Sequence, residues 1–385
     1  EHIQTPSFEY ADIFNEDRGS VGAQEMFKFF DRDNNMLVLR PDMTPAVARC
    51  VAKYFMDDDM PLRLCYLERT FKNNTSYQGY LKERAESGAE LIGDDSPDAD
   101  AEMIAMVIDC LKAAGLKEFQ VELGEVAFYR SLLQQSGLDE DAQAQLNDLI
   151  ENKNRFGVEE FLKNQDMEES LKEAFLKLPE LFGGINQIKK AKALTDNPQA
   201  LAAIERLERV HTLLEEYHMA DYVSYDLGML SRYQYYTGII FKAYTYGTGD
   251  YIVTGGRYNK LLVQFGKDTP AVGFAIVVDQ LMAALSRQQI HIPVQLVNTV
   301  ILYEPSARQS AVRLSRFFRS EGTPVQSMVM EEGKSLEDYK GMAKKRGLRT
   351  ILCLKDTGNT VTAFDMLTGN VDETPVSAYG VREIL

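Results

Sequence analysis

Apolar residues recur at two different spacings along this chain, and the change from one spacing to the other divides it into regions. Residues 98–114 carry apolar side chains three and four positions apart, which predicts a helix with one buried face. Asp98 or Asp100 is expected to cap its first turn, and Gly115 is expected to end it. The segment Phe119–Leu123 alternates apolar and polar residues, which predicts a half-buried strand.

A long helical region follows over residues 129–220. Its most regular helix is expected to start at Asn197-Pro198. The apolar residues on one face of this helix are Leu201, Ile204, Leu207, Leu214 and Tyr217. Alternation then returns in Ile239–Tyr244 and Tyr251–Thr254, which flank a glycine-rich turn and predict an antiparallel hairpin. A helix over Met282–Arg287 closes this part of the chain.

The end of the chain has a different rhythm. Residues 290–297 are expected to form a linker, after which strand and helix patterns alternate, as in a small separate α/β domain. The predicted elements are Thr299–Tyr303, Ser306–Glu321, Val325–Met330, Leu336–Arg346 and Thr350–Leu354. We therefore divide the chain into residues 1–128, a mainly helical insertion at 129–221, residues 222–289, and a C-terminal α/β domain at 296–385.

Composition sets broad limits on this picture. The chain has 385 residues, of which 45% are hydrophobic and 26% charged, as is ordinary for a soluble globular protein of two or three domains. No run approaches the roughly 20 apolar residues of a membrane span. There is no signal peptide at the visible start, so a cytoplasmic location is expected. Glu1 lies within what reads as an element already under way, and we expect a further segment before it.

Charge and the metal-binding residue types disfavour several functions. A net charge of −16 disfavours nucleic acid as a partner, because phosphate neutralisation supplies most of that affinity. His211 and His218 lie seven positions apart on a predicted helix, without the carboxylate or cysteine partners of a metal site. The cysteines have no CxxC spacing and are expected to be buried reduced thiols: Cys50, Cys65, Cys110 and Cys353. No metal and no cofactor are therefore expected.

Acidic side chains in two segments are able to bind a cationic or N–H-donating group. In Leu39–Thr44 (LRPDMT), Asp42 offers the kind of carboxylate that a buried ammonium group needs to offset its desolvation. Glu86 and Glu90 are further carboxylates, which accept hydrogen bonds from N–H donors. Taken singly, the hexapeptide equally fits a loop fixed by its proline, and the glutamates equally fit an exposed acidic face of a strand or helix.

Aromatic side chains occur in two further segments. Tyr235, Tyr236 and Tyr258 can stack on a planar ring of a ligand and hydrogen-bond to it. The same tyrosines equally fit an aromatic-rich strand that fills a core, because their hydroxyl groups need only some partner. The tyrosines by themselves therefore leave both interpretations open.

In order and spacing, four segments resemble the histidine-specific class II aminoacyl-tRNA synthetases: Leu39–Thr44, Ser231–Lys242 (SRYQYYTGIIFK), Gly255–Tyr258 (GGRY) and Gly273–Leu281 (GFAIVVDQL). The resemblance implies an α+β fold, with a class II antiparallel sheet flanked by helices. In that fold residues 1–128 and 222–289 form two parts of one core, with a helical insertion between them and a small C-terminal α/β domain. It also implies a histidine-binding site made of Asp42, Thr44, Glu86, Glu90, Tyr235, Tyr236 and Tyr258.

Positions that serve ATP or the adenylate in that family are altered here: Lys72, Asn74, Ser231, Val277 and Gln280. Lys72 replaces an arginine that grips the α-phosphate with a planar fork, and Asn74 replaces a glutamate that contacts adenine. Ser231 replaces an arginine that stabilises charge as the adenylate forms. Arg232 is expected to face the opposite way on a strand, so it does not substitute for that arginine. Val277 adds bulk in place of a glycine, and Gln280 removes an arginine that stacks on adenine.

A kept amino-acid site with altered ATP positions is similar to the ATP phosphoribosyltransferase regulatory subunit (HisZ) family of histidine biosynthesis, whose pattern includes LRPDMT. By that resemblance the chain has no catalytic residues of its own. It would activate a short-form catalytic subunit, relay feedback inhibition by L-histidine, and form a homodimer within a hetero-oligomer. Two alternatives remain, a histidine–tRNA ligase and a free-standing histidine-binding module. Neither a membrane nor tRNA is an expected partner.

Overall fold

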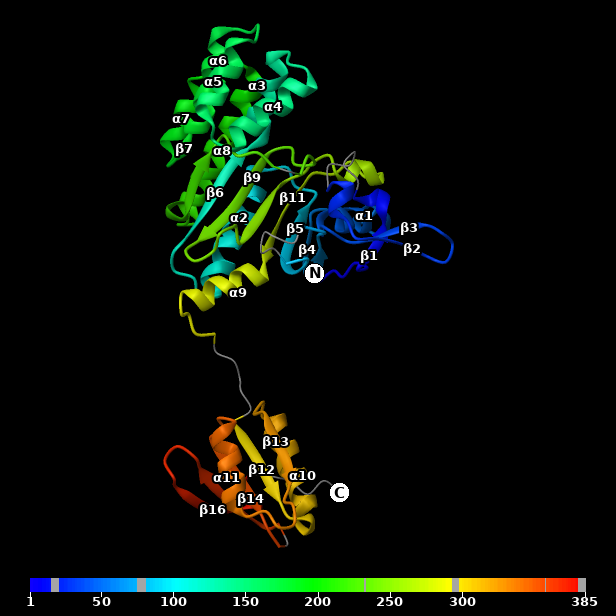
Figure 1. Ribbon diagram of the computed structural model, residues 1–385, viewed down its shortest axis with the longest axis vertical. Coiled ribbons are helices and arrows are strands. Elements are labelled where there is room, and N and C mark those ends of the chain that lie inside the picture. Colours follow the sequence, from blue (N-terminus) through cyan, green and yellow to red (C-terminus); the bar gives the residue numbers. More distant parts are fainter. Residues whose placement is uncertain (15–20, 75–80, 232, 293–297, 357, 380–385) are drawn as a thin grey trace. The chain divides into compact units, whose positions relative to one another are not determined.

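The computed structural model describes residues 1–14, 21–74, 81–231, 233–292, 298–356 and 358–379. Arg232, whose orientation the sequence analysis predicted, and part of the predicted linker lie outside these residues. The chain forms two compact units, Glu1–His291 and Ile292–Leu385, which are described separately (Figure 1). Within the described ranges, no helix is long and apolar enough to cross a membrane.

A mixed, mainly antiparallel sheet forms the centre of the first unit (Figure 1). Within the described residues, the only parallel pairing in this sheet joins β6 to β8. The predicted hairpin is confirmed, because β9 and β10 pair antiparallel with Gly255 opposite Phe241. In spatial order the strands are β4 (Leu62–Phe71), β5 (Glu83–Ile92), β11 (Ala271–Val277), β10 (Val253–Arg257), β9 (Ile239–Thr245), β6 (Phe119–Glu125), β8 (Val223–Asp226) and β7 (Phe182–Gly183).

Helix α2 (Pro97–Ala113) lies at the predicted place but is capped by a different residue. Ser96 is the cap, since its Oγ accepts a hydrogen bond from the Ala99 N–H at 3.2 Å. The prediction that Asp98 or Asp100 caps the helix is therefore wrong. Pro97 sets the first helical position, and Asp100, one turn in, is fully buried. Gly115, with φ of 99°, follows the helix as predicted.

Six helices form a group beyond the β6–β8–β7 end of the sheet (Figure 1). They are α3 (Val126–Ser136), α4 (Glu140–Glu151), α5 (Arg155–Lys163), α6 (Glu169–Lys177), α7 (Asn186–Lys192) and α8 (Pro198–Glu216). We call this group the helical segment. Asn197 caps α8 as predicted, because its side chain accepts hydrogen bonds from the backbone N–H groups of Gln199 and Ala200.

A small antiparallel sheet precedes the large one. It consists of β1 (Phe8–Tyr10), β3 (Met36–Leu39) and β2 (Lys28–Phe30), with β3 in the middle. The LRPDMT hexapeptide leads from the end of β3 into α1 (Thr44–Tyr54). Two further elements matter below: helix α9 (Val278–Arg287) follows β11 directly, and Tyr258 follows β10.

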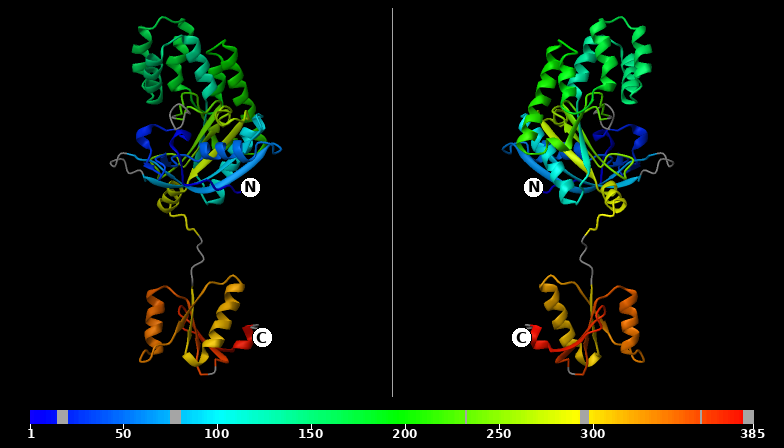
Figure 2. Two further views of the ribbon diagram at one scale, coloured as in Figure 1. Left: turned by 90° about the vertical axis from the view of Figure 1, so that its right-hand side faces the viewer. Right: turned by 90° about the vertical axis from the view of Figure 1, so that its left-hand side faces the viewer.

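The second unit has helices on both faces of a five-stranded sheet (Figure 2). Helix α10 (Arg308–Ser320) packs Ala311 and Leu314 against one face, and α11 (Leu336–Lys345) packs Tyr339 and Ala343 against the other. The predicted strands β12 (Thr299–Tyr303), β13 (Val325–Val329) and β14 (Thr350–Leu354) are parallel. Two antiparallel strands that the sequence analysis missed, β15 (Thr360–Asp365) and β16 (Val371–Pro375), complete the sheet.

The cysteines are all free, but most are not buried as predicted. Cys353 is buried, Cys50 is half-buried, and both Cys65 and Cys110 are exposed. Cys65 lies on β4 at a position where exposed and buried residues alternate, and it falls on the exposed face. On a strand with one buried and one exposed face, apolar neighbours in the sequence therefore do not decide whether a residue is buried.

Candidate amino-acid pocket

A pocket opens on one face of the large sheet, over β5, β10 and β11. Its empty space, including the mouth, is about 480 Å³. The start of α1 and the loop that carries Tyr233, Tyr235 and Tyr236 form its sides. Six of the seven predicted ligand-binding residues line it: Asp42, Thr44, Glu86, Tyr235, Tyr236 and Tyr258. The seventh, Glu90, is hydrogen-bonded to two of these six.

Strand geometry places the acidic residues on the pocket face. Glu86 and Glu90 lie four positions apart on β5 and therefore share one face of the sheet. Glu90 is opposite Gly273 of β11, and the side chain needs that glycine. A Cβ atom at position 273 would lie 1.6 Å from Oε2 of Glu90, so no other residue fits there without moving the carboxyl group. The glycine of the GFAIVVDQL motif thus makes room for a carboxyl group on the neighbouring strand.

Glu90 is almost completely buried, with only 1% of its surface exposed. Its carboxyl group accepts hydrogen bonds from Thr44 Oγ1 at 3.1 Å and from Tyr258 Oη at 2.5 Å. Burial raises the pKa of Glu90 to about 8, although both hydrogen bonds act to lower it. The alternative that this glutamate lies on an exposed acidic face is therefore wrong. A carboxyl group with this pKa holds its proton at neutral pH.

Two further carboxyl groups line the same pocket. Asp42 accepts a hydrogen bond from Tyr235 Oη at 2.9 Å and one from the backbone N–H of Thr44 at 3.1 Å. Glu86 accepts a hydrogen bond from Thr70 Oγ1 at 2.8 Å. Burial raises the pKa of both Asp42 and Glu86, and the positive charge of Lys72 opposes that rise in each case. The pocket therefore has an acidic floor that a cationic group of a ligand would stabilise.

The tyrosines form a continuous wall. The ring centroids of Tyr233 and Tyr235 lie 5.2 Å apart in a stacked arrangement, and those of Tyr235 and Tyr236 lie 4.8 Å apart. Tyr258 meets Tyr235 edge to face at 6.0 Å. The same rings belong to the hydrophobic core around α1, so the core and ligand interpretations of these residues are both compatible with the structure. We call Tyr233, Tyr235, Tyr236 and Tyr258 the tyrosine wall.

The loop before Tyr236 differs from the sequence prediction. Ser231 and residues 233–236 are in loop and turn conformation and not in a strand. The argument that Arg232 faces the opposite way rested on a strand, so it fails. Ser231 Oγ accepts a hydrogen bond from the backbone N–H of Tyr233 at 3.1 Å, a local turn contact that competes with strand pairing.

The altered ATP positions are divided between the pocket and its surroundings. Lys72 and Val277 line the pocket, and Lys72 Nζ donates a hydrogen bond to Tyr233 Oη at 2.5 Å. Gln280 is half-buried in the first turn of α9. Asn74 has a buried side-chain nitrogen for which the described residues supply no hydrogen-bond partner.

The sequence analysis missed several lining residues, among them Tyr233, Arg84 and Tyr251. Arg84 lies two positions before Glu86 on β5, so strand alternation was a sufficient signal for its placement. Tyr233 is adjacent to the chosen tyrosines, but the family pattern has no tyrosine there. Its role in the wall was visible only from the tertiary structure.

Comparison with known proteins agrees with this site. A family model described as histidyl-tRNA synthetase matches residues 1–281. An ATP phosphoribosyltransferase regulatory subunit of Acetivibrio thermocellus is 35% identical over 375 residues, which cover 97% of this chain and 89% of that protein. A protein of the same name from Clostridium acetobutylicum is 40% identical over 287 residues, 74% of this chain and 70% of that protein. This chain belongs to the histidyl-tRNA synthetase-like family of ATP phosphoribosyltransferase regulatory subunits.

Solved structures of the family show the same fold. A Bacillus halodurans protein described as an ATP phosphoribosyltransferase regulatory subunit/histidyl-tRNA synthetase superposes with a TM-score of 0.81 at 31% identity, covering 93% of this chain and 90% of that one. The histidyl-tRNA synthetase of Nostoc superposes with a TM-score of 0.77 over 98% of this chain and 90% of that one, but at 18% identity it supports the fold alone. The predicted α+β class II fold and the predicted family are confirmed.

Proposed function

We propose that this chain is the non-catalytic regulatory subunit of an ATP phosphoribosyltransferase in histidine biosynthesis, and that it senses L-histidine for a short-form catalytic subunit. Relatives with the name of such a subunit match almost the whole chain. The geometry adds a reason for the sensing role. The acidic floor and the tyrosine wall line one pocket, which supports an amino-acid ligand, while the positions that would serve ATP are altered.

The observation that carries the proposal is the placement of Glu90. A carboxyl group that is 1% exposed is costly to ionise unless a ligand supplies a donor or a positive charge. Thr44 and Tyr258 each donate to it, so the carboxyl group is held in one orientation. The imidazole of histidine supplies an N–H donor and can take up the proton of Glu90, which forms an ion pair.

The rest of the site suits the remaining groups of histidine. Asp42 is held by Tyr235 and by the backbone of Thr44, and it offers a carboxylate to the ammonium group of the ligand. Thr44 lies between the two ends of the site, because its N–H binds Asp42 and its hydroxyl group binds Glu90. We therefore assign the binding of histidine to Asp42, Thr44, Glu86, Glu90, Tyr235, Tyr236 and Tyr258.

The residues around the pocket do not favour adenylate chemistry. Lys72 offers a point charge without the planar fork of arginine, and it is engaged with Tyr233. Val277 is 3% exposed and lines the pocket at the end of β11, where the bulk of its side chain reduces the room for a nucleotide. Ser231 has no charge with which to stabilise the negative charge that develops at the α-phosphate as an adenylate forms and pyrophosphate leaves. These features support regulation over the tRNA ligase alternative.

The decisive experiment measures ATP phosphoribosyltransferase activity of a short-form catalytic subunit with and without this chain, over a titration of histidine. We expect activation by the chain and its reversal by histidine. Absence of both effects would refute the proposal. Histidine-dependent pyrophosphate exchange then distinguishes the tRNA ligase from a free-standing histidine-binding module, since only a ligase catalyses that exchange.

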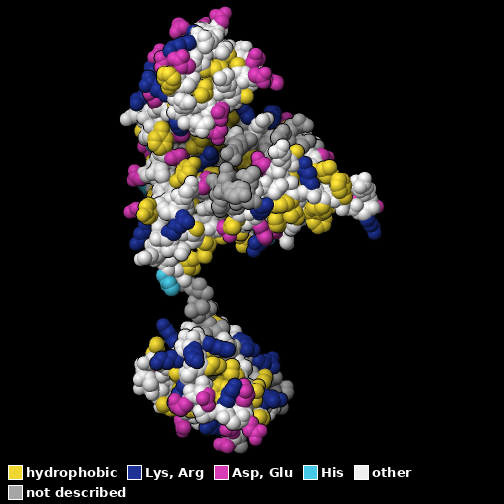
Figure 3. Space-filling view, in the orientation of Figure 1, with side chains coloured by type: hydrophobic (Ala, Val, Ile, Leu, Met, Phe, Trp, Pro, Cys, Tyr) yellow, Lys and Arg dark blue, Asp and Glu magenta, His cyan; other side chains and the backbone are white. Residues whose placement is uncertain are grey.

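We also propose that the chain forms a homodimer within the hetero-oligomer. The sheet of β1, β3 and β2 exposes large apolar side chains, and hydrophobic surface gathers over this region (Figure 3). These are Phe8 at 54%, Tyr10 at 54%, Phe30 at 60% and Met36 at 43% exposure. Analytical ultracentrifugation is expected to show a dimer, and Phe30→Asp is expected to shift it toward monomer. A wild-type monomer at micromolar concentration would contradict the proposal.

A further inference from the structure

An arginine of the helical segment holds the backbone of the tyrosine wall. Arg130 on α3 donates one hydrogen bond to the carbonyl oxygen of Tyr236 at 2.7 Å and another to that of Gln234 at 2.9 Å. The loop between these carbonyl groups carries Tyr235, whose hydroxyl group binds Asp42 in the pocket. One guanidinium group thus connects a helix outside the pocket with the residues that close it.

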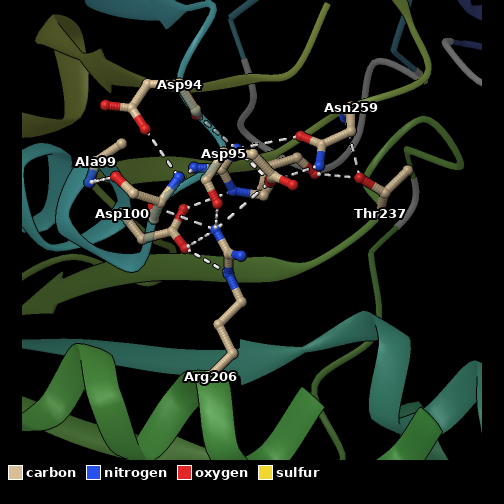
Figure 4. A network of polar contacts seen from close by, with 9 residues as sticks. Asp94, Asp95, Ala99, Asp100, Arg206, Thr237 and Asn259 are labelled. Atoms are coloured by element: carbon tan, nitrogen blue, oxygen red, sulfur yellow. Dashed lines mark hydrogen bonds and ion pairs between the residues drawn. The ribbon is translucent and has the colours of Figure 1, made fainter. Parts of the chain in front are cut away.

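A second connection runs from α8 to Tyr258 through buried charges. Arg206 Nε donates to Oδ2 of Asp100 at 2.8 Å, and Arg257 Nε donates to Oδ1 of the same carboxylate at 2.7 Å (Figure 4). Asp100 is fully buried and Arg257 is 2% exposed. The residue after Arg257 is Tyr258, which donates to Glu90.

The same network also reaches the loop of the tyrosine wall. The carbonyl oxygen of Arg257 accepts a hydrogen bond from the backbone N–H of Thr237 at 2.7 Å. The Thr237 hydroxyl accepts one from the N–H of Asn259 at 3.0 Å, and the Asn259 side chain donates to Asp95 at 2.9 Å (Figure 4). Both sides of the tyrosine wall are therefore held by side chains of the helical segment and of the residues around the start of α2.

Arg206 and Arg257 share the buried carboxylate of Asp100, so a displacement of α8 that breaks these bonds leaves buried charge without its partner. Arg130 on α3 binds two backbone carbonyl groups instead, and these hydrogen bonds oppose a displacement of α3. A ligand that moves the tyrosine wall would displace the same bonds. Coupling of this kind is reciprocal: if the ligand of the pocket changes the affinity of the helices for a partner by some factor, that partner changes the affinity of the pocket for its ligand by the same factor.

We propose that Arg130 and Arg206 are positioning residues that couple occupancy of the amino-acid pocket to the helical segment, which makes α3 and α8 the part of the chain that responds to the effector. The effector, and with it the coupling, rests on the proposed function. The positioning role does not, since the bonds that support the tyrosine wall are present without a ligand.

Hydrogen exchange of the free full-length protein tests the positioning. Arg130→Met removes both donors at similar length, Arg130→Lys keeps one charged donor, and Arg155→Met is the control. Arg155 is also in the helical segment, but its partner is the exposed Glu180 on the surface. We expect amides of residues 233–238 to exchange at least tenfold faster in Arg130→Met, less so in Arg130→Lys, and at the wild-type rate in Arg155→Met.

Exchange with added histidine tests the coupling. In the wild type, histidine is expected to slow exchange in α3 and α8 as well as in the pocket. In a double variant with Arg130→Met and Arg206→Met, protection is expected to remain confined to the pocket. Calorimetry is expected to show at least tenfold weaker histidine binding in Arg130→Met, about 1.4 kcal/mol, with partial recovery in Arg130→Lys.

The outcomes separate the two proposals. Absence of histidine binding in the wild type refutes the sensing role, while the free-protein exchange still decides the positioning role. Unchanged exchange of residues 233–238 in Arg130→Met overturns the positioning role of Arg130. Histidine binding without protection of α3 and α8 overturns the coupling, even if the affinity falls.

Discussion

The pKa of Glu90 predicts how the stability of this protein depends on pH. The folded protein holds the proton of Glu90 up to about pH 8, whereas the unfolded chain releases it above the ordinary pKa of 4.5. Between these values the folded state binds more protons, so stability falls as pH rises. A rise in pKa of this size corresponds to about 5 kcal/mol of unfolding free energy lost across the window.

Glu90→Gln removes this dependence. Glutamine keeps the size of the side chain and one of the two oxygens that accept from Thr44 and Tyr258, but it does not ionise. Urea unfolding, followed by near-ultraviolet circular dichroism of the tyrosines, gives the free energy of unfolding at several pH values from 5 to 9. We expect the free energy of unfolding of Glu90→Gln to rise relative to that of the wild type as pH rises. The change in this difference between the two ends of the pH range is expected to be several kcal/mol.

The control variant changes an exposed carboxylate on the strand that carries Glu90. Glu83 lies on the same strand with half of its side chain exposed, in an ion pair with Arg69. Glu83→Gln therefore tests the loss of one charge without the loss of a buried group. If the free energies of unfolding of the wild type and of Glu90→Gln change in parallel over the whole pH range, the conclusion that burial keeps Glu90 protonated is refuted.

Three further predictions concern the pocket and its support. Asp42→Asn is expected to weaken histidine binding at least tenfold, about 1.4 kcal/mol, because the ligand's ammonium group loses its carboxylate; calorimetry measures this, and unchanged affinity would remove Asp42 from the site. Gly273→Ala is expected to displace Glu90, to abolish detectable binding, and to cost ~1–3 kcal/mol of stability by overpacking. Normal binding by that variant would contradict the close approach of β11 to Glu90. Asp100→Asn is expected to destabilise the protein by ~3–5 kcal/mol in thermal unfolding, since two arginines lose a buried charged partner; a loss below 1 kcal/mol would argue against the network.

Local patterns predicted most of the elements correctly. Helix α8 begins at the expected Asn197-Pro198, and the hairpin of β9 and β10 has the expected partners. Caps and periodic apolar positions act over a few residues, so the sequence carries them directly. The cap of α2 shows the limit of that approach. Ser96, Asp98 and Asp100 are all good capping residues, but Pro97 occupies the first helical position, so Ser96 is the cap, and Asp100 binds the arginines of β10 and α8.

The residues of the candidate site came from the resemblance to the synthetase family, and the structure brings them together. The pocket-lining residues that the sequence analysis missed were missed for different reasons. Arg84 follows from strand alternation with Glu86, whereas Tyr233 belongs to a loop whose path no periodicity predicts. The expectation of a strand around Tyr233 and Tyr235 was wrong for the same reason, since aromatic residues favour strands but a local turn contact with Ser231 prevails here.

The sequence by itself determined the elements, the family and the chemical types that meet in the pocket: carboxyl groups, tyrosines, and a lysine where related enzymes have an arginine. Only the tertiary structure decided that Glu90 is buried behind Thr44 and Tyr258, with its pKa raised to about 8. It also decided that Arg130 binds the backbone of the tyrosine wall and that Arg206 shares the carboxylate of Asp100 with Arg257. The physical reason is that burial and charge pairing depend on residues far apart in the chain, such as Thr44 and Glu90 or Asp100 and Arg257, which come together only when the sheet forms.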